Sequence, residues 1–156
     1  MVVTHPPTTE TLQRTIDKFW EALLPAWRSI RFHIRETATQ RFDISEEQYH
    51  VLRHVAHGIG SMSELAAAKQ ISLPAVSQSV ETLVQKGLLT RRQSVDDRRF
   101  VQLSLTENGS ALLDAIYSVN RQWMAGKLAG LGEEDLLGLI QAMEALHKTF
   151  VHNPAE

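Results

Sequence analysis

The spacing of apolar residues along the chain predicts a mainly helical protein with one short pair of strands. Apolar residues recur every three or four positions over 9–39, 46–56, 64–70, 74–86, 107–128 and 133–150, which is the period of an amphipathic helix. In 100–105 the period changes to two, and the apolar positions become Val101, Leu103 and Leu105. This alternation predicts a strand with one buried face, paired with residues 88–95 across a short charged turn.

Capping residues set the expected ends of the helices. Ser45 followed by Gln48 forms a capping box at the start of one helix, and Gly58 ends it. The next helix is capped by Ser61 or Ser63, with Leu65 and Ala68 facing inward. The helix after it has Pro74 in its first turn and Gly87 just past its end, the usual positions of these two residues.

The helix at 74–86 has an unusual outer face. Its expected core face is Val76, Val80, Leu83 and Val84, which leaves small and polar residues outside: Ala75, Ser77, Gln78, Ser79 and Thr82. Small side chains allow close approach to a groove, and glutamine can pair bidentately with adenine. The alternative is an ordinary solvated helix face, although such faces usually carry Glu and Lys.

A long apolar stripe runs along residues 9–39. Its members recur at spacings of three and four and are Ile16, Trp20, Leu23, Trp27, Ile30 and Ile34. Pro25 lies inside this run and either kinks one long helix or opens a second; the kink is favoured. A stripe of this length exceeds what one small domain needs, so it is interpreted as a surface for a partner helix.

Composition excludes several classes of protein. The chain has 156 residues and no cysteine, which rules out disulfides, thiolate metal ligands and thiol-based redox sensing. No apolar run reaches the roughly 18 residues of a membrane span, and the first residues do not form a secretion signal. The expected location is the cytoplasm.

Charge is distributed unevenly. The formal net charge is −2, but residues 61–106 carry a net of +2 and residues 107–156 a net of −4. Between Lys86 and Arg99 there are five cations and two anions. The positive field is therefore local, as a nucleic-acid interface requires. An ordinary solvated surface remains the alternative for Lys86, Arg91 and Arg92.

The sequence resembles the MarR family of bacterial winged-helix transcriptional regulators. The resemblance rests on Ser45–Leu52, Leu65-Ala66, the 74–87 helix, Asp97-x-Arg99 and Leu103-x-Leu105-Thr106-x-x-Gly109. It implies a mainly α fold with a small β-hairpin wing: a winged helix-turn-helix flanked by long dimerisation helices. The implied domains are an N-terminal dimerisation helix at 9–43, a DNA-binding domain at 44–106 and C-terminal dimerisation helices at 107–152.

The resemblance also implies partners and contacts. Members are homodimers that bind double-stranded DNA at pseudo-palindromic operators, with repression as the usual outcome. Recognition-helix contacts would come from Ser72, Pro74, Ala75, Ser77, Gln78 and Thr82. Wing contacts would come from Arg91, Asp97, Arg98 and Arg99. Asp97 would orient Arg99, and either Arg98 or Arg99 would enter the minor groove.

Effector binding is a further expectation. Family members commonly release DNA when a small aromatic acid or phenol binds. Aromatic residues with polar tips suit a flat anionic ligand, and the candidates here are Trp20, Trp27, His33, Tyr49 and Trp123. The alternative is that each of these is plain core at helical spacing.

Three histidines raise a metal-responsive alternative of the same fold. His50, His54 and His57 are spaced i, i+4 and i+7, which can bind zinc, but a surface histidine stripe is favoured. No resident metal or cofactor is expected. The sequence has no phosphate loop and no activated nucleophile, so an enzyme is not expected. A winged helix used only for protein contacts stays open as an alternative.

Overall fold

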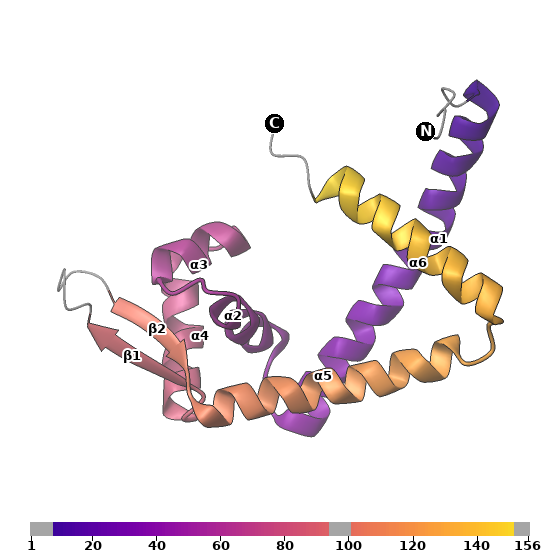
Figure 1. Cartoon of the computed structure of the whole chain (residues 1–156). Helices are drawn as coiled ribbons and strands as arrows, with labels where there is room; N and C mark the ends of the chain where they lie inside the picture. Colours follow the sequence, from indigo (N-terminus) through magenta and orange to yellow (C-terminus); the bar gives the residue numbers. More distant parts are fainter. Residues whose placement is uncertain (1–7, 94–100, 152–156) are drawn as a thin grey trace, which may run out of the picture. The chain divides into compact units, whose positions relative to one another are not determined.

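The computed structural model describes residues 8–93 and 101–151. Its elements (Figure 1) are α1 (Thr9–Glu36), the π-helix η1 (Thr37–Arg41), α2 (Glu46–Ala56), α3 (Met62–Lys69), α4 (Leu73–Gln85), β1 (Leu89–Gln93), β2 (Val101–Leu105), α5 (Glu107–Leu128) and α6 (Glu133–Phe150). The chain forms two compact units, one up to Tyr117 and one from Ser118 onward. The boundary falls inside α5, and each unit is described by itself.

Two of the helices begin at capping boxes, and the one at Ser45 is the box that the sequence predicted. At the start of α2, Ser45 Oγ accepts a hydrogen bond from the Gln48 amide at 3.1 Å, and the Gln48 side chain accepts one from the Ser45 amide. At the start of α3, Ser61 and Glu64 repeat this pattern. Ser61, of the two candidates, is therefore the cap. Each box satisfies helix N–H groups that have no partner within the helix.

Helix α1 runs through Pro25 without a break, so the first of the two interpretations, one long helix, is confirmed. The predicted helix extends to about residue 39, whereas the α-helix ends at Glu36 and a π-helical turn follows. Thr37 and Ala38 in this turn are buried. The wider turn carries the chain from an α1 with no buried residue into the core of the first unit.

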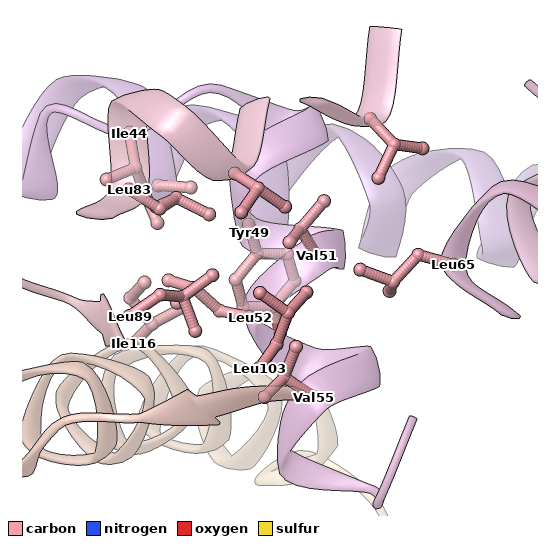
Figure 2. Packing of buried hydrophobic residues seen from close by; sticks show 13 residues of the cluster. Ile44, Tyr49, Val51, Leu52, Val55, Leu65, Leu83, Leu89, Leu103 and Ile116 are labelled. Carbon is pink, nitrogen blue, oxygen red and sulfur yellow. The ribbon is translucent and has the colours of Figure 1, made fainter. Parts of the chain in front are cut away.

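The core lies among α2, α4, the hairpin and the first half of α5 (Figure 2). Tyr49, Leu52 and Val55 of α2 are buried together with Leu89, Leu103 and Ile116. In α4 the core face is also as predicted, with Val76, Val80 and Leu83 completely buried. One inward prediction is wrong: Ala68 is exposed, and Ala66 packs against the core instead. Leu65 occupies the inward side of this short helix, and Ala66 is its immediate neighbour.

The two strands form an antiparallel hairpin. Leu89 pairs with Leu105, Arg91 with Leu103 and Gln93 with Val101. Leu103 is buried while Gln102 and Ser104 are exposed, as the alternation predicts. The Leu103 amide also donates to the Gly60 carbonyl at 2.7 Å. The hairpin is thereby attached to the connection between α2 and α3.

The long helices differ from this core. Neither α1 nor α6 has a buried residue. Their apolar stripes are exposed, with Trp20 at 58%, Trp27 at 56% and Ile140 at 54% of full accessibility. Within 8–93 and 101–151, no helix is both long and apolar enough to cross a membrane.

Candidate nucleic-acid interface

A tight left-handed turn joins α3 to α4. Gln70 ends α3 with φ 54°, a conformation that reverses the helix and is uncommon outside glycine. The Ile71 amide then donates to the Ala66 carbonyl at 3.2 Å, which closes the end of α3. Helix α4 starts two residues later and packs against α3. Helices α3 and α4 are thus the helix-turn-helix that the sequence predicts.

The outer face of α4 is accessible. The predicted contact residues Ser72, Pro74, Ala75, Ser77 and Gln78 are all exposed. Thr82 is half-buried, and its hydroxyl donates to the Gln78 carbonyl at 3.0 Å. This hydroxyl is therefore engaged within the helix, whereas the other predicted contact residues face solvent.

The N-terminus of α4 is capped differently from those of α2 and α3. Ser72 has the extended backbone of an N-cap but makes no side-chain capping bond. The residue three positions later is Ala75, so there is no side chain to complete a capping box. The first amide groups of α4, at the positive end of its dipole, have no side-chain cap and suit an anion such as a backbone phosphate.

Thr106 and Gly109 fasten the base of the hairpin. The Thr106 hydroxyl donates to the Gly87 carbonyl at 2.7 Å and accepts from the Gly109 amide at 2.9 Å. A Cβ on Gly109 would lie 2.1 Å from the Leu88 carbonyl oxygen. These contacts explain the Thr-x-x-Gly spacing physically: the hydroxyl bridges the turn between α4 and β1 to the start of α5, and the glycine permits their close approach.

Arg91 lies against the recognition helix. Its Nη1 is 2.9 Å from Oε2 of Glu81 on α4. The register places Arg91 opposite Leu103, on the inward face of the hairpin, so its stem extends along the core toward Glu81. Arg92 is exposed and lies on the opposite face, since side chains alternate along a strand.

Lys86 holds the other end of α4. Its ammonium donates to the Asp43 carbonyl and lies 3.2 Å from the Asp43 carboxylate. The pair connects α4 to the segment before α2. The remaining wing predictions, Asp97, Arg98 and Arg99, lie outside the described residues.

A cavity of about 320 Å³ opens beside α2 in the first unit. Its lining combines the indole of Trp27 and Ile34 with cationic groups from Arg31, Arg53 and Lys69. A neighbouring hollow of about 400 Å³ shares Trp27 and Arg31 and adds residues of α1. The cations and the flat apolar wall together suit a small aromatic anion.

Ion pairs surround this cavity. Glu46 Oε1 accepts from Arg31 Nε at 2.8 Å, and this hydrogen bond lowers the pKa of the Glu46 carboxyl. Lys69 Nζ lies 3.1 Å from a Glu47 oxygen. Burial, followed by the charge of Lys69, lowers the pKa of the His50 imidazole. His50 is therefore held toward its neutral form.

Within the first unit, the predicted ligand-pocket residues do not converge. Trp27 lines the cavity, but Tyr49 belongs to the hydrophobic core and Trp20 is exposed on α1. His33 lies 3.4 Å from the Thr37 hydroxyl. Trp123 belongs to the second unit, where Lys127 stacks over its ring. The guanidinium and ammonium groups of the cavity were missed, because only their juxtaposition in space reveals them.

The histidine triplet does not form a metal site in the described ranges. No group of three His, Cys, Asp or Glu side chains there could hold an ion. The Nδ1 of His57 lies 2.7 Å from the Arg53 carbonyl, so that ring is turned back onto its own helix. Burial also lowers the pKa of His54. Only the helical spacing of these three histidines had suggested a metal site.

The arrangement of α2, α3, α4 and the hairpin defines a winged helix-turn-helix. Residues 42–99 match the profile described as the MarR family. Two curated relatives match part of the chain. The HTH-type transcriptional repressor MdtR of Bacillus subtilis is 33% identical over 81 residues, 52% of each chain. The HTH-type transcriptional regulator BilQ of Clostridium symbiosum is 34% identical over 57% of this chain and 62% of its own.

Solved structures share the fold over more of the chain. A MarR family protein from Bacillus stearothermophilus has a TM-score of 0.76 at 18% identity, covering 87% of this chain and 95% of that one. MepR of Staphylococcus aureus has a TM-score of 0.67 at 23% identity, covering 92% and 98%. Residues 42–99 are thus similar to the MarR family, and the chain shares the fold of these solved structures. Its matches to the curated relatives span about half to three fifths of their lengths.

Proposed function

We propose that this protein is a transcriptional regulator that binds a specific double-stranded DNA sequence as a homodimer. The accessible, small-residue face of α4 is the observation that carries this proposal. Apart from Leu73 and Gln78, the exposed side chains in the first two turns of α4 are small, so this face can approach base edges closely. The N-terminus of α4 has no side-chain cap and suits a phosphate. The role is one of binding, without catalysis.

The relatives support the same role. The curated relatives are named as a transcriptional repressor and a transcriptional regulator. A mutant of MepR, similar in fold at 23% identity and a TM-score of 0.62, is described as bound to an oligodeoxyribonucleotide. We extend the proposal to repression, with release by a small ligand, and to the cytoplasm as the place where the protein meets DNA.

Selection of duplexes from a random pool tests DNA binding directly. The purified protein should enrich a pseudo-palindrome whose half-sites are about 10 bp apart. Its affinity should fall steeply with salt. Gln78→Ala should weaken binding and relax the sequence preference at one position of each half-site, whereas Lys148→Ala, an exposed cation at the end of α6, should leave binding unchanged.

The wing gives a second, independent test. The double variant Arg98→Ala/Arg99→Ala should bind the selected duplex more weakly and with a smaller salt dependence, because each lost phosphate contact reduces the slope by about one. Binding equal to that of the parent at moderate salt would remove the wing from the interface. It would favour the alternative in which the winged helix contacts another protein.

The exposed stripes on α1 and α6 support the homodimer. Large apolar side chains that are about half exposed follow one another at helical spacing, including Trp20, Leu24 and Trp27 on α1. Contiguous exposed apolar surface marks an interaction site, and a second copy offers the same apolar helices. Sedimentation equilibrium should give twice the mass of one chain; a single-chain mass at micromolar concentration would contradict the proposal.

The cavity beside α2 supports a small aromatic anion as the effector. Salicylate is a suitable probe because its ring can stack on Trp27 while its carboxylate pairs with Arg53 or Lys69. Calorimetry should detect binding by the parent and not by Arg53→Ala. Arg41→Ala, which changes an exposed arginine outside the cavity, should bind as the parent does. No heat with any of a panel of such acids would remove this part of the proposal.

A further inference from the structure

Among the described residues of the winged helix-turn-helix, one large apolar side chain is exposed. Leu73, the first residue of α4, is 50% accessible, whereas Val76 and Leu83 of the same helix are completely buried. Between Phe32 and Tyr117, Leu73 alone among the described large apolar side chains is exposed. The remaining ones lie on the long helices, on the connection between α5 and α6, or at Val151 just past α6. Leu73 is therefore an isolated large apolar side chain on the described surface of this region.

Its position within α4 gives this exposure a meaning. When a recognition helix enters the major groove, its N-terminal residues contact the base edges. Leu73 is the largest exposed side chain of the first turn, because its neighbours are Ser72, Pro74 and Ala75. It also lies one turn before Ser77 on the same side of the helix. The apolar group and the polar contacts thus belong to one continuous face.

The major groove offers one apolar partner. Base edges there present hydrogen-bond donors and acceptors, except for the C5-methyl group of thymine. If Leu73 covered a polar base edge, the donors and acceptors of that edge would lose their water at a cost in free energy. A thymine methyl group would instead pack favourably against Leu73. We infer that Leu73 contacts a thymine methyl in each half-site and selects a T·A pair at that position. This inference rests on the proposed function.

Deoxyuridine tests the contact without changing base pairing. In a duplex selected by the parent protein, each thymine of a half-site is replaced singly by deoxyuridine, which lacks only the methyl group. At one position the dissociation constant of the parent should rise about fourfold, and about fifteenfold when both half-sites are changed. Leu73→Ala should bind the thymine and deoxyuridine duplexes equally, whereas Leu73→Met, which keeps an apolar chain, should retain the preference.

Each outcome bears on the inference. If the parent tolerates deoxyuridine at every position, or if the penalty persists in Leu73→Ala, the contact does not exist although DNA binding stands. If the parent binds no duplex with salt sensitivity, the proposed function itself fails and the contact falls with it. Thermal unfolding of Leu73→Ala close to that of the parent confirms that the half-exposed residue was changed without loss of the fold.

Discussion

The winged helix-turn-helix buries many of its apolar residues, whereas the long helices α1 and α6 bury none of theirs. Helix α2 buries four of its 11 residues, and α4 completely buries the valines and the leucine of its inner face. Helix α1 has 28 residues and buries none, and α6 has 18 and buries none. The first region completes its core within one chain. The second presents exposed apolar stripes, which the proposed dimer would cover, so stability and assembly would depend on different parts of one sequence.

The largest expected effect would come from the α1 stripe. Trp20→Ala should raise the dissociation constant of the dimer by about 100-fold or more, because each of two copies loses a large apolar side chain at the interface. Sedimentation measures this, and the melting temperature of the parent, but not of the variant, should rise with protein concentration. Gln13→Ala, a polar change on the same helix, should dimerise normally. If Trp20→Ala dimerised as tightly as the parent, the α1 stripe would not be the dimer interface.

Alanine substitutions at two glycines of α5 test which part of this helix packs against the core. Gly109→Ala would place a Cβ 2.1 Å from the Leu88 carbonyl oxygen, so the backbone must shift. We expect a loss of about 2–4 kcal/mol in the free energy of unfolding, measured with urea. Gly126→Ala in the same helix meets no atom within 4 Å and should be neutral or stabilising by about 0.5–1 kcal/mol. Equal losses would show that packing does not distinguish the two glycines.

Two serine caps separate stability from binding. Ser45→Ala removes a capping box and should lower the free energy of unfolding by about 1 kcal/mol. Ser72→Ala removes no capping bond and should change stability by a few tenths of a kcal/mol at most, yet weaken DNA binding. Urea unfolding and duplex titration of both variants measure the difference. Reversal of the two results would mean that Ser72 serves the fold and not the ligand.

The Arg91–Glu81 pair gives a smaller effect. Their side chains are 33% and 52% exposed, so a double-mutant cycle of unfolding free energies should give a coupling of only about 0.5 kcal/mol. The exchange Glu81→Arg/Arg91→Glu should recover most of it. Arg92→Ala, on the other face of β1, should show no coupling to Glu81→Ala. Coupling of the same size for both arginines would deny a specific pair.

The smallest effect concerns pH. The pKa values of His50 and His54 are lowered in the folded protein, mainly by burial and then by Lys69. Arg53 opposes their protonation as well, while Glu46 and Glu47 favour it for His50 and Glu47 for His54. Protonation therefore opposes folding: this stability is present above about pH 6.5 and is lost as pH falls through the folded values. His50→Gln should flatten the stability profile below pH 6.5; an unchanged slope would contradict the assignment.

Local rules predicted much of the fold. The capping box at Ser45, the glycine just past α4 and the core face of α4 all follow from contacts within one helix or from its period. The strand faces follow from alternation, and Leu103 is buried as expected. Because these features depend on residues that are close in the sequence, they can be predicted from the sequence alone.

Features that need distant neighbours were not predicted. Ala66 and Ala68 are alike in sequence, and only the packing of α3 decides which of them meets the core. Arg91 was grouped with the contact arginines by its charge, although its place opposite Leu103 turns it inward toward Glu81. Leu73 was overlooked because a leucine at the start of a helix is an ordinary core residue until its exposure is known.

The Thr106 bridge has a mechanical consequence. One hydroxyl joins the turn between α4 and β1 to the helix that follows the hairpin, and Gly109 lets the two backbones approach closely. Rotation of the first turn of α5 would therefore carry the base of the hairpin with it.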